Sequence, residues 1–164
     1  MNPDSANYLA FDTGFPNDYD RAHGRTGAYL MVHGSCSSAG CYAITDQAIA
    51  ELYAIAREAF AGGQPAFQFQ AYPFRMRAEN FAKHRADPNI AFWRNLKEGS
   101  DVFEVTREEP RVSVVDQRYD FGPEQPTVAE KRAADEQNVA ELVARGVPAV
   151  RMVYEDGSQH ASFR

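Results

Sequence analysis

The sequence predicts an α+β domain, in which strands and helices both contribute to the core. Short apolar runs bounded by Gly, Pro, Asn and Asp recur through the first two thirds of the chain, which is typical of strands. An apolar pattern with helical spacing follows Asp46. Strands and helices alternate irregularly, unlike the regular βαβ units of a parallel sheet.

The first predicted elements surround a loop rich in Gly and Ser. Tyr8–Phe11 predicts a short strand, and the apolar run Ala28–Val32 predicts a buried strand that leads into a histidine. Gly and Ser oppose both helix and strand, so Gly34–Ala43 is expected to be a loop. Thr45 or Asp46 can then cap a helix.

That helix has one apolar face, followed by a clear stop signal. The face consists of Ile49, Leu52, Tyr53, Ala56 and Phe60. The pair Gly62-Gly63 predicts the end of the helix. Beyond it, Phe67–Tyr72 alternates apolar and polar residues and predicts another strand.

The middle of the chain predicts two short helices and two strands. The helices are expected at Ala78–Arg85 and Asn89–Lys97, with Gly99 ending the second. The strands are expected at Val102–Val105 and Val112–Val115.

The last part of the chain is polar and prone to form a helix. Thr127 and Glu130 have capping-box spacing, and Gly146 marks the end of the helix. The apolar face of this helix is thin, so it is expected to be peripheral. Ala149–Tyr154 predicts a returning edge strand.

Composition excludes several functional classes. The net charge is −6 and the basic residues are scattered, which argues against a dedicated nucleic-acid binder. No apolar run approaches the roughly 18 residues of a membrane span. The N-terminus has neither the basic start nor the apolar core of a signal peptide.

The loop after the predicted buried strand holds both cysteines of the chain, Cys36 and Cys41, just after His33. A cysteine nucleophile needs a nearby base and donors for the developing oxyanion. His33 can supply the base, and the amides of Gly40 and Cys41 can supply the donors. The positive end of the helix that begins near Asp46 also favours a thiolate. These residues predict a catalytic Cys41.

Three other interpretations of these residues stay open. Cys41 is a small side chain that can simply be buried. His33, Cys36 and Cys41 could be three ligands of a zinc ion, although no second pair of ligands at typical spacing supplies a fourth. Cys36 and Cys41 could also form a disulfide.

The other histidines and the serines of the loop carry weaker signals. The histidines at positions 23, 84 and 160 are expected to be solvated rather than catalytic. A serine triad is conceivable in the loop, but a cysteine in the same loop is the better nucleophile at neutral pH. The serines are therefore expected to shape the loop or donate hydrogen bonds.

The segment HGSCSSAGCYAITD resembles the active-site segment of the L,D-transpeptidase (YkuD-like) catalytic domain, in particular its YafK-like branch. The resemblance rests on His33, on the run Ser38–Cys41 and on the continuation to Asp46. FPNDYDRAHGRTG, YPFRM and FWRNLKEGSDVFE add to it. Ala39 stands where the commoner motif has a second histidine, and Ala43 where it often has Arg or Asn.

The resemblance implies a mixed-sheet fold and a cysteine-dependent reaction without a metal or organic cofactor. The reaction would be acyl transfer or hydrolysis at the L-centre of diaminopimelate in peptidoglycan stem peptides, through a thioacyl enzyme. Cys41 would be the nucleophile and His33 the base. The implied oxyanion and supporting residues are Gly40, Ser38 and Gly34, and the implied substrate-binding residues are Arg25 and Arg75.

The resemblance also sets expectations for partners, location and domain limits. It implies peptidoglycan stem peptides and a peptidoglycan-linked envelope lipoprotein as partners, in the periplasm or cell envelope. Residues 1–116 would form the catalytic domain, lacking its N-terminal part, and residues 117–164 a polar helical extension. The rival expectation is a truncated, inactive domain that binds peptidoglycan or a protein.

Overall fold

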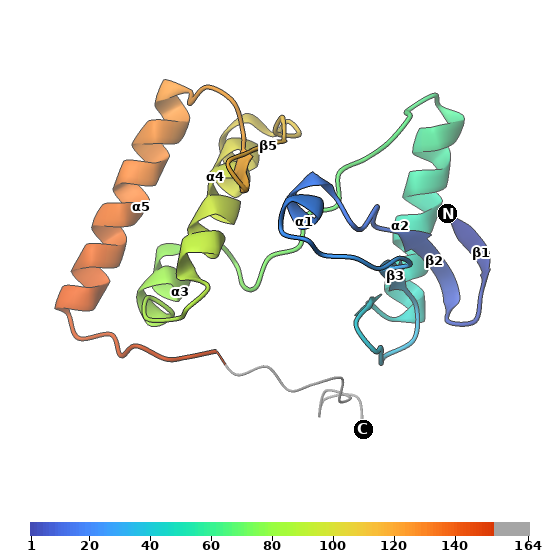
Figure 1. The fold of residues 1–164 in the computed structure, drawn as a ribbon, viewed down its shortest axis with the longest axis horizontal. Coiled ribbons are helices and arrows are strands. Elements are labelled where there is room, and N and C mark those ends of the chain that lie inside the picture. The colour runs from blue at the N-terminus through green and yellow to red at the C-terminus, as the bar shows by residue number, and fades with distance from the viewer. Residues whose placement is uncertain (153–164) are drawn as a thin grey trace. The chain divides into compact units, whose positions relative to one another are not determined.

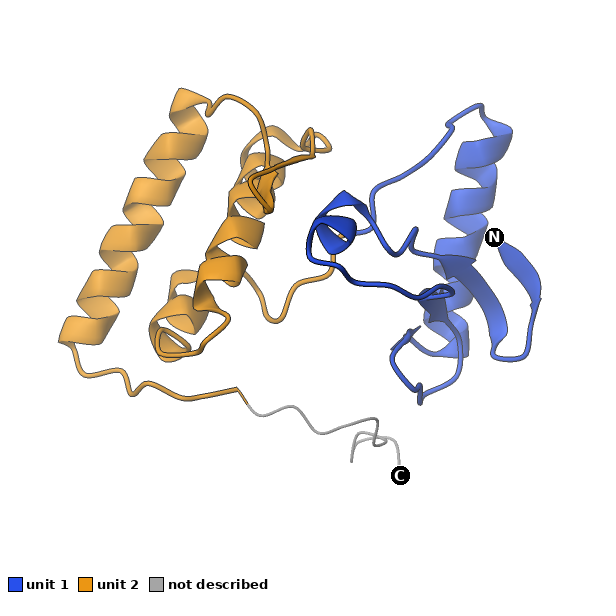
Figure 2. Cartoon of the chain, in the orientation of Figure 1, with its two compact units in different colours: residues 1–69, 154–164 blue, residues 70–153 orange. Residues whose placement is uncertain are grey.

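The structure, a computed structural model, describes residues 1–152 and contains two compact units. Unit 1 comprises residues 1–69, and unit 2 begins at Gln70 and continues to the end of the described residues (Figure 2). None of the described helices is both long and apolar enough to cross a membrane.

Unit 1 contains a four-stranded mixed sheet with the strand order β1-β2-β3-β4 (Figure 1). The pairs β1/β2 and β2/β3 are antiparallel, whereas β3/β4 is parallel. This mixed sheet, accompanied by helices, confirms the α+β prediction. The elements of unit 1 are β1 (Asn2–Ser5), β2 (Tyr8–Asp12), α1 (Asp18–Ala22), β3 (Met31–His33), β4 (Tyr42–Ala43) and α2 (Asp46–Ala61).

The register of the sheet separates an apolar face from a second face. Phe11 of β2 is paired with Val32 of β3, and Val32 with Tyr42 of β4, so these three side chains share one face. Phe11 and Val32 pack there against Ile49 of α2 and form the core of unit 1. The next row of the register, which includes His33, lies on the opposite face.

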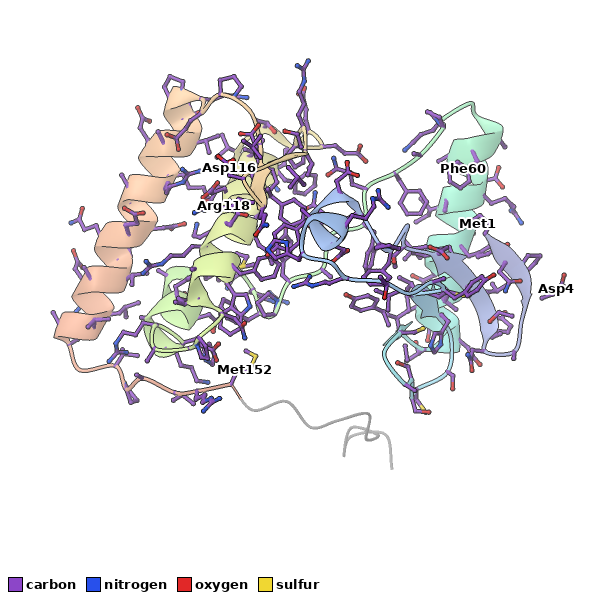
Figure 3. The ribbon with its side chains drawn as sticks, in the orientation of Figure 1. Met1, Asp4, Phe60, Asp116, Arg118 and Met152 are labelled. Atoms are coloured by element: carbon purple, nitrogen blue, oxygen red, sulfur yellow. The ribbon has the colours of Figure 1, made fainter. Side chains whose placement is uncertain are left out.

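Helix α2 forms as its sequence predicts. Thr45 is the N-cap, and its Oγ1 accepts a hydrogen bond from the amide of Ala48 at 3.3 Å. The helix ends at Gly62. Of the predicted apolar face, Ile49 and Ala56 are buried, whereas Phe60, labelled in Figure 3, is 37% exposed.

Two strand predictions in unit 1 need correction. Phe67–Tyr72 is not a strand, because no neighbouring strand pairs with it among the described residues. Its aromatic residues pack as individual rings instead, with Phe67 against Phe11 and Phe69 against Tyr42. The strand predicted at Ala28–Val32 begins only at Met31, since the preceding Tyr29 has a positive φ of 62°.

Unit 2 is built mainly from three helices. The buried residues Met76, Phe81 and Trp93 form its core. Its last helix packs against the other two. The elements of unit 2 are α3 (Ala78–Lys83), α4 (Ile90–Thr106), β5 (Ser113–Val115), β6 (Arg118–Asp120) and α5 (Pro126–Ala144).

Helix α4 continues well past its predicted end, so the strand predicted at Val102–Val105 is wrong. Gly99 lies inside the helix rather than at its end. A β-carbon at this position would lie 2.3 Å from Cε1 of Phe121, so the glycine allows the ring to approach the helix. The residue marks a close contact and not a stop signal.

Gly99→Ala is expected to destabilise unit 2 by about 1–3 kcal/mol, because the Phe121 ring must move out of its packed position. This cost exceeds the gain of up to about 1 kcal/mol that alanine brings to a helix interior. Urea unfolding of wild type and variant measures the difference. In a Phe121→Ala background the same change should be neutral or stabilising. A similar loss in both backgrounds would rule out the ring as the cause.

The C-terminal predictions are only partly correct. Helix α5 has Gln125 as its N-cap, with no side-chain capping bond, so the capping box of Thr127 and Glu130 is wrong. Pro126 occupies the first turn, where its missing amide proton costs nothing. Of the predicted strand 149–154, the described residues 149–152 are not strand, and the remainder lies outside the described residues.

The predicted domain boundary at residue 116 falls inside a hairpin. Strands β5 and β6 pair antiparallel, with Val115 opposite Arg118. Asp116, labelled in Figure 3, and Gln117 form the turn between them, and both have positive φ values. The two compact units of the structure meet in sequence at residues 69 and 70.

Candidate active site

His33 ends strand β3 and is buried, with 4% of its surface exposed. It is paired with Ala10 of β2 on one side and Ala43 of β4 on the other. Its Nδ1 donates a hydrogen bond to the carbonyl oxygen of Gly34. A carbonyl only accepts, so the neutral ring carries its proton on Nδ1 and leaves Nε2 as the basic nitrogen.

Cys41 lies immediately before β4 and is partly exposed. His33 is paired with Ala43, and Cys41 stands two residues before Ala43, just outside the parallel strand β4. Strand spacing and rise place the two Cα atoms about 8 Å apart. Rotation of both side chains can bridge such a separation.

In this structure the Cys41 thiol donates its hydrogen bond to a main-chain carbonyl and not to the ring of His33. Its Sγ lies 3.6 Å from the carbonyl oxygen of Tyr29. Within residues 1–152 no hydrogen bond joins this thiol to the ring of His33. The fold therefore returns the loop that carries Cys41 to strand β3 beside His33, with the thiol directed toward Tyr29.

Short contacts hold the loop between β3 and β4. The hydroxyl of Ser38 donates to the carbonyl oxygen of Cys41. The amide of Ser35 donates to Oδ1 of Asp46 at 2.7 Å, and the amide of Thr45 donates to the Ser35 carbonyl at 3.0 Å. Gly40 has a φ of 108°, which other residues rarely adopt, and this sets the orientation of the peptide before Cys41.

Three residues near the site were not predicted to have a role in it. Tyr29 contributes its carbonyl, and a main-chain contact has no side-chain signature in a sequence. Asp46 was recognised only as a possible helix cap, yet it ties the loop to the first turn of α2. Thr45 both caps α2 and bonds the loop. Thr45 and Asp46 follow the loop within a few residues, and this proximity in the sequence was the available signal.

Gly34, one of the predicted supporting residues, sits in a tight space. A β-carbon there would lie 2.5 Å from Oδ1 of Asp46 and 2.6 Å from the carbonyl oxygen of Asn7. Its own amide donates to the carbonyl of Leu9 at 3.1 Å. The position next to His33 therefore tolerates no side chain without movement of the backbone.

Gly34→Ala is expected to lower the free energy of unfolding of unit 1 by about 1–3 kcal/mol, because a backbone oxygen of Asn7 cannot rotate away. It should also displace the carbonyl that orients the His33 ring. Thermal unfolding and the alkylation rate of Cys41 measure the two effects. Ser37→Ala, at an exposed position of the same loop, is the control and should change neither. If Gly34→Ala and Ser37→Ala had the same thermal stability and the same Cys41 alkylation rate, the tight packing at Gly34 would not be the cause.

The two predicted substrate-binding arginines lie in different units. Arg25 of unit 1 pairs with Asp20 at 2.9 Å and lies 5.3 Å from the ring centre of Tyr19. A substrate carboxylate at Arg25 would have to compete with Asp20. Arg75 belongs to unit 2 and is exposed.

The structure also bears on the alternative interpretations. Cys41 is partly exposed and therefore not a buried filler, and both cysteines are thiols rather than a disulfide. Among the described residues no group of three His, Cys, Asp or Glu side chains could hold a metal ion.

Of the other histidines, His84 was expected to be solvated but is buried. Its ring is stacked on Phe74, and its Nδ1 donates a hydrogen bond to the Val150 carbonyl. His23 is exposed, as expected, and His160 lies outside the described residues.

Comparison with known proteins identifies two relatives. No family model matches the chain. Two curated proteins, both named "Putative L,D-transpeptidase YafK", come from Escherichia coli K12 and Escherichia coli O157:H7. Each is 50% identical to this chain over 119 residues, which is 73% of this chain and 48% of the relative. The match thus spans about half the length of these curated relatives.

Proposed function

We propose, since the chain belongs to the YafK-like branch of the L,D-transpeptidase family, that it carries out cysteine-dependent acyl chemistry on peptidoglycan stem peptides in the cell envelope. The observation that carries the proposal is the parallel pairing of β3 and β4, in which His33 is paired with Ala43, two residues after Cys41. The partial exposure of Cys41 supports it as well, because a peptide can reach the thiol.

The first half of the reaction uses the thiol as nucleophile. The Cys41 side chain rotates from Tyr29 toward His33, and Nε2 of the ring takes the thiol proton. The sulfur then attacks the carbonyl at the L-centre of diaminopimelate. The amides around Gly40 and Cys41 stabilise the oxyanion of the tetrahedral intermediate.

Collapse of this intermediate breaks the peptide bond and forms a thioester. The leaving amine, D-alanine or the amine of a linked protein, takes the proton from the His33 imidazolium. In the second half, water or another amine attacks the thioester and His33 accepts its proton. The bond between the acyl carbon and the Cys41 sulfur breaks, and the sulfur takes the proton back from the imidazolium. Water gives hydrolysis, and an amine gives transpeptidation. A peptidoglycan-linked envelope lipoprotein is a substrate of the hydrolytic direction, in which it would be released.

A trapped thioester tests the proposal directly. The purified chain is mixed with a diaminopimelate-containing tetrapeptide stem, quenched in acid and mapped by peptide mass spectrometry. We expect the acyl group on Cys41, none on Cys36, and free D-alanine in solution. Absence of both adduct and D-alanine, with Cys41 still reactive toward iodoacetamide, would favour a peptidoglycan-binding domain without catalysis.

A further inference from the structure

The peptide group between Gly34 and Ser35 connects the ring of His33 to a carboxylate. Its carbonyl oxygen, on Gly34, accepts the hydrogen bond from Nδ1 of His33. Its amide, on Ser35, donates to Oδ1 of Asp46 at 2.7 Å. Because a peptide group is planar, a tilt at the amide also turns the carbonyl. The contact with Asp46 therefore sets the direction in which the carbonyl faces the ring.

Other contacts hold this part of the chain on both sides of the peptide. The amide of Gly34 donates to the carbonyl of Leu9 at 3.1 Å, and the carbonyl of Ser35 accepts from the amide of Thr45 at 3.0 Å. Ser35 has a φ of 66°, a left-handed conformation that serine rarely adopts and that persists only where its surroundings maintain it. Of these contacts, the one from Asp46 is made by a side chain, so a substitution can remove it alone.

The two hydrogen bonds of the peptide reinforce each other. The partial double bond between carbon and nitrogen couples the amide to the carbonyl. A carboxylate that accepts from the amide makes the carbonyl a stronger acceptor for Nδ1 of His33. Loss of the carboxylate would therefore weaken the contact that selects the ring tautomer.

We propose that Asp46 is a positioning residue for His33 and acts through the peptide group between them. The proposal rests on the proposed function, in which Nε2 of His33 takes the thiol proton of Cys41. The bond from Asp46 fixes the peptide plane, and the carbonyl of that plane keeps the ring proton on Nδ1. Nε2 is then left as the acceptor. Asp46 is exposed, so solvent screens its charge and the hydrogen bond contributes more than the charge.

The ring tautomer of His33 tests the proposal without any substrate. Nitrogen NMR of the labelled chain in mildly alkaline buffer shows which ring nitrogen carries the proton, and we expect Nδ1 in wild type. Asp46→Ala removes the acceptor and should give a mixture of the two tautomers. Asp46→Asn keeps an oxygen for the Ser35 amide and should retain the wild-type tautomer. An unchanged tautomer in Asp46→Ala overturns the proposal.

Turnover of a diaminopimelate-containing tetrapeptide measures the consequence for the reaction. Asp46→Ala is expected to lower kcat roughly tenfold or more and to change KM by less than about twofold, because it displaces the base and leaves substrate binding intact. Asp46→Asn should lose no more than about fivefold. Glu51→Gln, at an exposed position of the same helix, removes an equal charge and should change neither constant. Equal losses for Asp46→Ala and Glu51→Gln overturn the proposal.

Thermal unfolding separates positioning from simple stability. Asp46 lies in the first turn of α2, where a carboxylate favours the helix, so Asp46→Ala should also lower the melting temperature slightly. If the variant lost turnover only in proportion to its unfolded fraction, Asp46 would serve the helix alone and the proposal would fall.

The measurements distinguish this proposal from the proposed function. If wild type forms no thioester but the His33 tautomer depends on Asp46, the positioning role stands and the catalytic function falls. If the thioester forms and neither the tautomer nor kcat responds to Asp46→Ala, the function stands and the positioning role falls.

Discussion

Cys41→Ala is expected to abolish thioester formation and to reduce turnover of a diaminopimelate-containing stem peptide by roughly 10⁴-fold or more, because no other group supplies the covalent intermediate. His33→Gln should cause a loss of similar order, since glutamine cannot accept the thiol proton. The double variant should be no worse than either single one, because nucleophile and base act as a unit. Release of D-alanine, measured by coupled assay, gives the rates.

Cys36→Ala is the matched control for this experiment. Cys36 is an exposed thiol of the same loop, and the change removes the same chemical group. Its turnover should stay within about twofold of wild type, as expected for a surface substitution. A loss at Cys36 equal to the loss at Cys41 would mean that the chemistry does not belong to Cys41 alone.

Strand register, which the sequence only hints at, pairs His33 with Ala43, two residues after the predicted nucleophile Cys41. The apolar run before His33 identified a buried strand. It could not say that the segment after Cys41 would return parallel to it, since the loop between them fits several geometries. The Tyr29 carbonyl was invisible to sequence reasoning because any residue provides one.

Helix α2 was well predicted because several local signals agree. Thr45 caps it, Ile49 and Ala56 lie on its buried face, and Gly62 ends it. The strands predicted at Phe67–Tyr72 and Val102–Val105 failed because strand propensity is weak without a partner strand. Val102–Val105 is held in a helix by the turns around it, and Phe67 and Phe69 bury their rings without any ladder.

A group of charged side chains, of which Lys97 and Asp101 are buried, joins α4 to α5 in unit 2, and sequence reasoning missed it. Nζ of Lys97 lies 2.6 Å from Oδ1 of Asp101 and 2.6 Å from Oδ2 of Asp135. Nζ of Lys131 contacts both aspartates at 2.8 Å and Glu104 at 3.0 Å. The 97/101 and 131/135 spacings each put opposite charges on one helix face, but only the packing of α5 on α4 brings the two pairs together.

These contacts lower the pKa of Asp135 and raise the pKa of Lys131. Burial alone would raise the pKa of Asp135, but hydrogen bonds from Lys131 and Lys97 outweigh it and the pKa is lowered. Burial alone would lower the pKa of Lys131, but its bonds to Asp101, Asp135 and Glu104 outweigh that and the pKa is raised. The stability from Asp135 is therefore complete above its ordinary pKa of about 3.9 and is lost at lower pH. The stability from Lys131 is complete below about 10.4 and is lost at higher pH.

Lys97→Met is expected to lower the free energy of unfolding of unit 2 by about 3 kcal/mol, because it removes one of two cations from Asp101, whose side chain is 1% exposed. Methionine keeps the length of the side chain, so the loss reports charge rather than volume. The variant should also lose less stability than wild type when the pH falls below about 4, since Asp135 keeps only one lysine partner.

Urea unfolding between pH 2 and pH 7 measures both effects of Lys97→Met. Arg145→Met breaks an exposed pair with Glu141 on α5 and should cost no more than about 0.5 kcal/mol, with no change in the pH profile. If the methionine variant at position 97 were instead as stable as wild type, the desolvation cost of the buried charges would equal their attraction. The cluster would then fix how α4 and α5 pair without adding to the stability of unit 2.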